Sequence, residues 1–155
     1  MSLNTINQYA LAIELISLGA RTKIVAKETG LSPKIIRQAI EDMHGQSAPS
    51  GSLKTSPQFI TKSFSRLKEG TLYVFFFRIE KNHDFCRRSI NAYRRYSSYI
   101  QTVSKKDPIF DFSDAYMIAK WSDSGILKLV RCGHCRSAKL VNNELQQNVC
   151  CVCKN

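Results

Sequence analysis

The residues with the most distinctive chemistry lie near the end of the sequence, where five of the six cysteines are found. The spacing Cys-x-x-Cys occurs twice, first at Cys132 and Cys135, then at Cys150 and Cys153, with a short spacer between the pairs. Each pair can fold into a tight knuckle that directs two thiolates at one point, and two knuckles complete a tetrahedron. The spacing therefore predicts a site for one Zn²⁺ per chain, because zinc accepts four soft sulfur ligands without a d-electron preference for geometry. Four protein ligands leave no position for a catalytic water, so we expect the zinc to be structural.

Other interpretations of these residues compete with the four-thiolate site. His134 offers an alternative ligand, but it lies inside the first knuckle, where the chain turns away from a metal. Cys151 is expected to point away from the ion. Two disulfides would need an oxidising compartment, whereas the polar sequence after Met1 shows no export signal and predicts a cytoplasmic protein with reduced thiols. A redox Cys-x-x-Cys normally opens a helix after a strand, which is not the predicted context here.

The composition predicts a partner with many negative charges. The 155 residues carry a net charge of +11 with a pI near 9.6, and residues 58–106 hold eleven Lys/Arg against three Asp/Glu. Such a field favours nucleic acid as the partner, although simple solubility is the alternative. The apolar fraction of 43% can fill one core, or one core with a small appendage. The longest apolar run, Leu72 to Phe77, is far below the ~18 residues of a membrane span.

Residues 22–41 have the pattern of a helix-turn-helix. Gly30 can supply the positive φ of the turn, Ser32 can cap the second helix, and Pro33 suits its first position. Ile35, Ile36, Ala39 and Ile40 are predicted to face inward. The second helix of such a unit enters the major groove of DNA. The residues predicted to contact DNA from this helix are Lys34, Arg37 and Gln38. A purely structural helical hairpin is the alternative.

The remaining pattern predicts a mainly α fold. A first helix, capped by Asn4 or Thr5, should precede the hairpin, and the Ser- and Pro-rich residues 46–57 form a linker or arm. Helices are expected within 59–80, over 85–103 and from Ser113 to about Ser122, followed by a short strand at 126–130. Basic residues on the 85–103 helix suit phosphate contacts, with a solvated basic face as the alternative. These residues are Arg87, Arg88, Arg94 and Arg95.

The predicted organisation has four parts. Residues 1–45 hold the N-terminal helices with the helix-turn-helix-like unit, and 46–57 form the linker. Residues 58–125 form a basic helical body, and 126–155 form a small four-cysteine zinc ribbon. Cys86 stands apart from the other cysteines and is expected to be a small buried residue.

Taken together, these segments resemble the FlhC family of flagellar transcriptional activators. The stretch from Glu14 to Arg21 is similar to the family's signature before the helix-turn-helix, and Ala92-Tyr93-Arg94-Arg95-Tyr96 is similar to its middle motif. Trp121, followed by Ser124-Gly125-Ile126-Leu127, leads into the cysteines as in the family. The four paired cysteines stand where the family has its zinc ligands. The resemblance covers nearly the whole chain and lies in the order of the motifs.

The resemblance implies a mostly helical protein that works with a second helical subunit, FlhD, in a heterohexamer of four FlhD and two FlhC. That complex binds and bends promoter DNA and recruits RNA polymerase, and similar pairs on conjugative plasmids and genomic islands activate transfer genes. This sequence departs from flagellar FlhC in stopping just after its last cysteine and in its very basic middle third. A regulator encoded on a mobile element is therefore also expected.

Two other function classes remain to be weighed. A zinc-stapled protein that binds RNA or the ribosome would share the charge and the ribbon. An enzyme is disfavoured, because no paired carboxylates, Gly-rich phosphate loop or nucleophile with a base stand out among the residues. The leading prediction is a DNA-binding subunit of a heteromeric activator, without membrane attachment.

Overall fold

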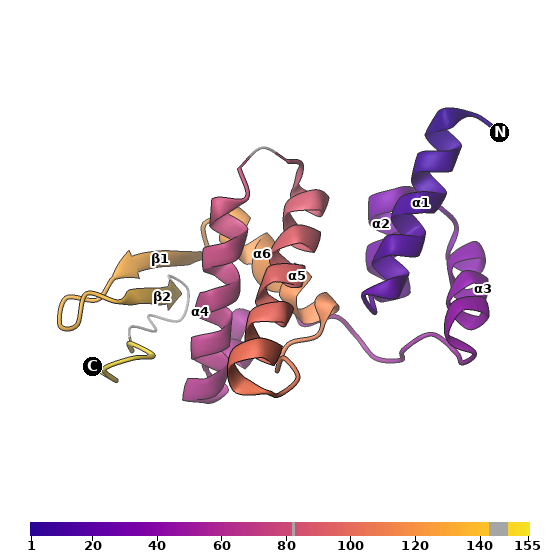
Figure 1. Ribbon diagram of the computed structural model, residues 1–155. Helices are drawn as coiled ribbons and strands as arrows, with labels where there is room; N and C mark the ends of the chain where they lie inside the picture. The colour runs from indigo at the N-terminus through magenta and orange to yellow at the C-terminus, as the bar shows by residue number, and fades with distance from the viewer. Residues whose placement is uncertain (82, 143–148) are drawn as a thin grey trace. The chain divides into compact units, whose positions relative to one another are not determined.

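The computed structural model describes residues 1–81, 83–142 and 149–155, and it divides the chain into two compact units, residues 1–52 and 53–155 (Figure 1). The predicted fold class is confirmed, since the described residues are mainly helical and end in a small strand pair with four clustered cysteines. Part of the spacer between the two cysteine pairs, 143–148, lies outside the described residues.

The first unit consists of three helices, α1 (Leu3–Ser17), α2 (Thr22–Thr29) and α3 (Pro33–His44). Small and branched apolar side chains from the three helices and from the turn after α1 fill its core. They are Ala12, Leu15, Ile16, Ala20, Ile24, Val25, Ile36 and Ile40. The imidazole Nε2 of His44 lies 3.0 Å from the carbonyl oxygen of Ile16, which joins the ends of α1 and α3.

The turn between α2 and α3 has the predicted chemistry. Gly30 has φ = 75°, a left-handed conformation that only glycine adopts without a steric penalty. The hydroxyl of Ser32 accepts a 3.4 Å hydrogen bond from the backbone N–H of Ile35, and Pro33 occupies the first helical position. The inward face was predicted too broadly, because Ile35 is 41% exposed while Ile36 and Ile40 are buried.

Helix α1 begins earlier than predicted. Ser2, rather than Asn4 or Thr5, is the N-cap, and its hydroxyl accepts a 3.2 Å hydrogen bond from the N–H of Thr5. All three residues have side chains suited to capping, so the choice depends on where α1 meets the rest of the first unit.

The second unit begins with a short 3₁₀ helix, η1 (Pro57–Lys62), followed by α4 (Phe64–Ile79). The helix predicted for the apolar run from residue 72 to 77 is confirmed, but residues 59–62 are not part of it. Ser63 has an extended backbone that separates η1 from α4. Its hydroxyl accepts a 3.1 Å hydrogen bond from Arg66 N–H. A capping serine therefore overrides the helical spacing of the flanking apolar residues.

Two more helices complete the body, α5 (Phe85–Ser104) and α6 (Phe112–Asp123). Helix α5 follows the predicted range closely. Helix α6 begins before the predicted Ser113, because the carboxylate of Asp111 caps it by accepting a 2.8 Å hydrogen bond from Asp114 N–H. The lone Cys86 is buried in α5, as predicted.

Aromatic side chains dominate the core of the second unit. The ring of Phe59 packs edge-on against Phe110 at 5.5 Å and lies 5.8 Å from Trp121. The Tyr96 hydroxyl donates a short hydrogen bond to the Glu69 carboxylate and accepts one of 3.3 Å from Phe110 N–H. These bonds join α4, α5 and the segment before α6 into one packed body.

The chain ends in a hairpin of two antiparallel strands, β1 (Leu127–Arg131) and β2 (Ala138–Asn142). In its register Leu129 lies opposite Leu140, and Arg131 lies opposite Ala138. Leu127 and Leu140 are buried in the same core cluster as the helices, so the hairpin is packed onto the helical body (Figure 1). None of the described helices combines the length and the apolarity needed to cross a bilayer.

Candidate metal centre and basic surface

Four cysteine sulfurs meet beside the hairpin. Those of Cys132, Cys135, Cys150 and Cys153 all lie within 4.8 Å of one another. The closest pairs cross between the two motifs, with 3.6 Å between Cys132 and Cys153 and 3.6 Å between Cys135 and Cys150. A disulfide needs about 2.05 Å, so these are separate thiols. The four predicted ligands are brought to one point.

The first knuckle is also the turn of the hairpin. Cys132 follows β1, its N–H donates to the carbonyl of Ser137 at 2.9 Å, and its carbonyl accepts from Arg136 N–H at 3.0 Å. Arg136 has φ = 64°, which closes the loop. The N–H of His134 lies 3.4 Å from the Cys132 sulfur and donates to it. The backbone alone therefore directs both sulfurs of this motif to the same side.

The second knuckle repeats this geometry eighteen positions later, although it has no strands to hold it. Cys150 N–H donates to the carbonyl of Asn155 at 2.8 Å, and its carbonyl accepts from Lys154 N–H at 3.0 Å. Lys154 has φ = 64°, and Val152 N–H donates to the Cys150 sulfur at 3.4 Å. Two copies of one local structure therefore face each other across the sulfur cluster.

The local hydrogen bonds favour the thiolate form on the first knuckle. The side-chain hydroxyl and then the backbone N–H of Ser137 lower the pKa of Cys135 to about 6. Backbone N–H groups of Cys135 and His134 lower the pKa of Cys132. At Cys153 the N–H of Asn155 lowers the pKa, but burial and the three neighbouring sulfurs outweigh it and raise the value to about 11. Four adjacent sulfurs cannot all ionise without a cation between them.

The geometry of the cluster fits a tetrahedral thiophilic ion. A tetrahedron with metal–sulfur bonds of about 2.3 Å has edges of about 3.8 Å, close to the 3.6 Å of the two shortest sulfur pairs. Four soft donors with no oxygen among them suit zinc and do not suit magnesium or calcium. The four cysteines could therefore hold one metal ion.

The two neighbouring candidates stay outside the cluster. His134 contributes its backbone N–H, and its side chain is not among the grouped ligand atoms. The thiol of Cys151 turns to the helical body, where its sulfur lies 3.9 Å from the hydroxyl oxygen of Thr71 on α4. Cys151 therefore contacts the body from between two residues of the second knuckle.

The predicted arginines on α5 differ in how much of each side chain reaches the surface. Arg94 and Arg95 are exposed, and Arg87 is half-buried on the same side of the helix. Arg88 has most of its side chain inside, with the guanidinium 4.1 Å from the centre of the Phe77 ring and 3.4 Å from an Asp123 carboxylate oxygen. It also donates a 3.4 Å hydrogen bond to the carbonyl of Phe77.

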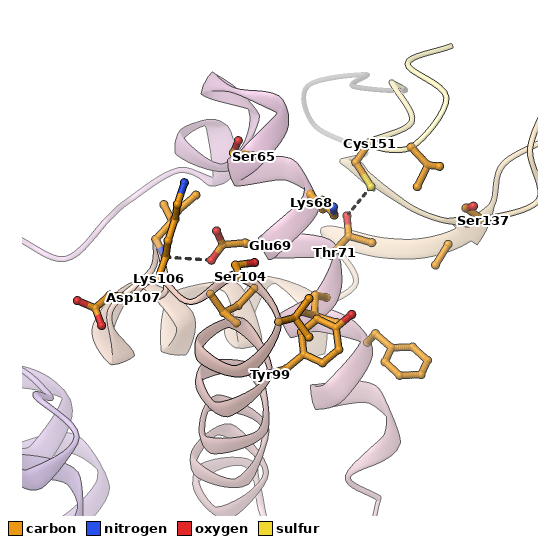
Figure 2. A pocket seen from close by; sticks show the side chains of 17 residues that line it. Ser65, Lys68, Glu69, Thr71, Tyr99, Ser104, Lys106, Asp107, Ser137 and Cys151 are labelled. Carbon is orange, nitrogen blue, oxygen red and sulfur yellow. Dashed lines mark hydrogen bonds between the residues drawn. The ribbon is translucent and has the colours of Figure 1, made fainter.

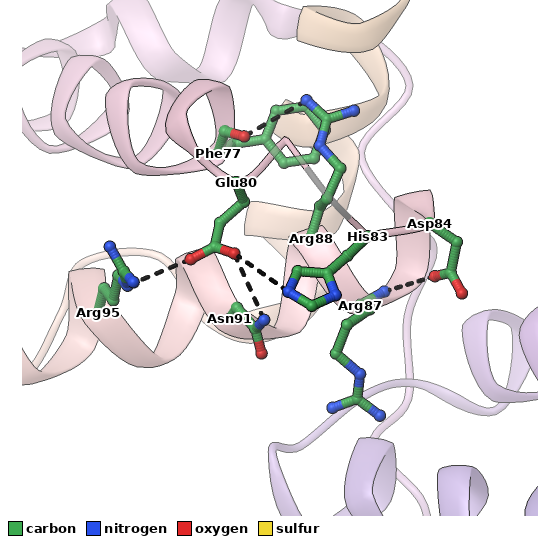
Figure 3. A network of polar contacts seen from close by, with 8 residues as sticks. All are labelled: Phe77, Glu80, His83, Asp84, Arg87, Arg88, Asn91 and Arg95. Carbon is green, nitrogen blue, oxygen red and sulfur yellow. Dashed lines mark hydrogen bonds and ion pairs between the residues drawn. The ribbon is translucent and has the colours of Figure 1, made fainter.

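A buried carboxylate holds part of this surface in place (Figure 3). Glu80 follows α4 and is 8% exposed. One of its oxygens lies 3.2 Å from Nε of Arg95, and the other accepts a 3.5 Å hydrogen bond from Asn91 and lies 3.9 Å from Nε2 of His83. Burial makes this carboxylate costly without partners, so it fixes Arg95 in a defined position on α5.

The predicted contacts in the first unit are all accessible. Lys34, Arg37 and Gln38 are exposed on α3. The amide of Gln38 donates a 2.9 Å hydrogen bond to the carboxylate of Asp42, one turn further along. The predicted polar residues of this helix therefore share its exposed face with an acidic group.

A known protein family matches this chain over almost its whole length. The family model described as "Flagellar transcriptional activator (FlhC)" matches residues 2–155. The chain belongs to the FlhC family. The resemblance drawn from the motifs is confirmed, and the FlhC family consists of transcriptional regulators, which are not a class of enzyme.

Three relatives, each described as a flagellar transcriptional regulator FlhC, show the extent of the similarity. The Variovorax paradoxus (strain S110) protein is 27% identical over 98% of this chain and 77% of its own length. The Paraburkholderia atlantica protein is 29% identical over 83% of this chain and 60% of its own length. The Enterobacter cloacae protein is 26% identical over 97% and 81%.

Sequence reasoning missed two residues that support these sites. Ser137 lowers the pKa of the Cys135 thiol, and its only sequence signal is its place two residues after the motif. Glu80 orients Arg95, and nothing in the local sequence indicates this, because the pair joins two helices.

Proposed function

We propose that this FlhC-family chain is the DNA-binding subunit of a heteromeric transcriptional activator that binds promoter DNA and recruits RNA polymerase. Its target genes would be flagellar or conjugative-transfer genes. Family membership supports the activator role. The observation that carries the DNA-binding role is the charge of the second unit, where residues 53–155 hold eighteen Lys/Arg against eight Asp/Glu.

Phosphate contacts would supply most of the affinity. Each phosphate that a basic side chain neutralises releases condensed counterions, so binding weakens steeply as salt is added. Arg94 and Arg95 are exposed on α5, with Arg87 on the same side, and we assign this role to them, although Nε of Arg95 already faces Glu80. Arg88 remains a predicted contact, although its guanidinium already has partners inside the unit.

The role of the metal would be structural, to hold the two cysteine knuckles in a fixed arrangement. In this proposal one structural Zn²⁺ per chain is held by the four clustered cysteines, and it keeps the second knuckle against the hairpin. The knuckles themselves carry exposed basic residues, Arg136 in the first and Lys154 in the second. Holding the knuckles rigid therefore also holds part of the positive surface rigid.

The partner would be an FlhD-like helical subunit, in a heterohexamer of four FlhD-like and two FlhC-like chains. Exposed apolar residues along one side of α1 support a need for such a partner, among them Leu3 at 73%, Ile6 at 49% and Ile13 at 54% exposed. The twofold symmetry of the assembly would set the spacing between two DNA half-sites.

The test is the paired variant Arg94→Ala with Arg95→Ala, in the complex with the FlhD-like subunit. Each lost phosphate contact lowers the slope of log affinity against log salt by about 0.9, so two contacts lower it by about 1.8. We expect promoter affinity at moderate salt to fall at least tenfold. The matched control, Arg94→Lys with Arg95→Lys, keeps both charges and should retain most of the slope. Unchanged affinity and slope in the alanine variant would remove this surface from the proposal.

The same assay separates DNA from RNA. In gel-shift competition, duplex promoter DNA should displace the labelled promoter at lower concentration than structured RNA of equal length. The reverse order would favour the RNA- or ribosome-binding alternative, because the charge alone suits either polymer.

A further inference from the structure

A groove on the second unit has no part in the DNA-binding proposal (Figure 2). Its volume is about 620 Å³, and it lies between α4, the end of α5 and the two cysteine knuckles. Apolar side chains form much of its lining. They are Leu72, Phe75, Tyr99, Ile100, Val103, Ile109, Ala138 and Val152. Phe75, Tyr99, Val103 and Val152 are each 45% exposed or more, so the groove leaves a concentrated apolar area uncovered.

The size of the groove favours a small ligand over a folded partner. Small-molecule sites typically have volumes of about 300–1,000 Å³, and this groove falls in that range. A stable protein interface uses about 20–30 residues on each side, whereas 17 residues line the groove. Its walls come from three different segments of one packed unit, so a small molecule could be enclosed on several sides.

The charges at the groove favour a ligand with a negative end. Lys68 and Lys106 line it, and neither has a carboxylate partner within the described part of the chain. Of the two acidic residues, Glu69 keeps its negative charge while one of its oxygens accepts hydrogen bonds from the Tyr96 hydroxyl and, at 2.9 Å, from Ile109 N–H, so the two lysines outnumber it by one charge. The side chain of Asp107 points away from the others in Figure 2. The surplus of ten positive charges on residues 53–155 adds attraction for an anion.

The wall formed by the two cysteine knuckles joins the groove to the cysteine cluster. Cys151 lies between two residues of the second knuckle, but its thiol faces Thr71 in the groove. Ser137 lines the groove and also hydrogen-bonds the sulfur of Cys135. The position of this wall therefore depends on the folded knuckles.

We propose that this groove binds a small amphipathic anion, with an apolar body against Leu72, Phe75 and Tyr99 and a carboxylate or similar group near Lys68 and Lys106. The apolar body would gain the usual free energy of removing hydrocarbon from water. The two amines would then discriminate between an acid and the uncharged alcohol of the same chain length. This binding site is independent of whether the chain binds DNA.

The experiment measures binding of decanoate and of 1-decanol to the full-length zinc-loaded protein by calorimetry, below micelle-forming concentrations. We expect saturable one-to-one binding of decanoate, at least tenfold tighter than that of 1-decanol. The paired variant Lys68→Glu with Lys106→Glu should lower the affinity for decanoate at least tenfold and change the affinity for 1-decanol less than twofold. The matched control, Lys62→Glu with Lys128→Glu, makes the same charge change on exposed residues outside the groove and should change decanoate less than twofold.

Two bulky substitutions test the location from opposite walls. Ala138→Trp on β2 and Val103→Trp on α5 should each lower the affinity for both decanoate and 1-decanol at least tenfold. The absorption of the Co²⁺-substituted cysteine site shows whether each variant has kept its fold. Decanoate binding that survives both substitutions, or that is absent from the parent protein, overturns the proposal. Loss of a protein partner from these variants, without decanoate binding by the parent, would assign the groove to a macromolecule and overturn it as well.

Discussion

The charges of this chain are divided unequally between its two compact units. Residues 1–52 carry five Lys/Arg and four Asp/Glu, an excess of one, whereas residues 53–155 carry an excess of ten. The unit with the helix-turn-helix pattern is thus nearly neutral, and the unit without that pattern is strongly basic. A motif that positions a helix and a field that attracts a polyanion are separate properties, and here they lie in different units.

The exposed face of α3 illustrates the difference. Lys34 and Arg37 are offset by Glu41 and Asp42, all four exposed, and Asp42 also holds the amide of Gln38. On α5 the exposed Arg94 and Arg95 are adjacent, and one buried carboxylate, Glu80, pairs with Arg95. The first unit offers apolar side chains on α1 and the second offers charge, so we expect protein contact from the first and phosphate contact from the second.

The largest expected effect comes from removing the zinc ion that we propose the four clustered cysteines hold. Zinc contributes about 10–16 kcal/mol in small zinc peptides, so chelation or Cys135→Ser should unfold the knuckles and the hairpin. Hydrogen exchange followed by mass spectrometry should show faster exchange over residues 126–142 and unchanged exchange over 1–52. The control Cys151→Ser leaves the four clustered sulfurs intact and should retain metal and protection. Equal loss of protection in both units would contradict their independence.

A smaller and equally local effect is expected at Gly70 in α4. A Cβ at this position would lie 2.7 Å from Cγ2 of the buried Ile60, so η1 must shift to accept it. Such overpacking costs about 1–3 kcal/mol, against a gain in helix propensity of up to about 1 kcal/mol. Gly70→Ala should therefore lower the free energy of unfolding of the second unit by about 1–2 kcal/mol, measured by urea denaturation.

The control for that measurement is Lys68→Ala, an exposed position in the same helix, which should change the stability of the second unit by less than about 0.5 kcal/mol. A stabilised Gly70→Ala variant would show that Ile60 moves aside at no cost, and that η1 is less firmly packed than its burial indicates.

The smallest expected effect tests most directly whether the two units differ in their contact with DNA. Lys34→Ala with Arg37→Ala removes two positive charges from α3, the same number as the alanine pair on α5. If the first unit makes no phosphate or base contact, promoter affinity should fall less than threefold and the salt slope should stay the same. A tenfold loss, or a loss confined to one base position, would assign DNA reading to α3 instead.

Much of the architecture could be predicted because its determinants are close together in the sequence. Gly30, Ser32 and Pro33 define a turn through their own backbone preferences. The cysteine pairs were recognisable for the same reason, since each knuckle closes through hydrogen bonds within six residues. The spacing also predicted that the two knuckles share one site, and the structure adds which sulfurs lie closest, those of Cys132 and Cys153 at 3.6 Å.

The predictions that needed correction depended on packing between elements. Ile35 belongs to the apolar pattern of α3, yet it is exposed, because the neighbouring helices cover only the side that carries Ile36 and Ile40. Ser63 is an exception, because it interrupts the helical spacing through a local cap on the Arg66 N–H. The twin arginines of α5 look alike in sequence, but Arg88 lies over Phe77 and Arg95 pairs with Glu80.

By itself, the sequence determined which segments are helical, where the turn between α2 and α3 lies, which four sulfurs are paired by spacing, and that the chain is strongly basic. Those properties arise from backbone preferences and from charge, and neither depends on distant residues. Only the tertiary structure decided which basic side chains remain exposed, that the groove of Leu72 and Tyr99 exists, and that Cys151 faces it. These outcomes depend on which surfaces are buried against each other, and burial is a property of the whole packed unit.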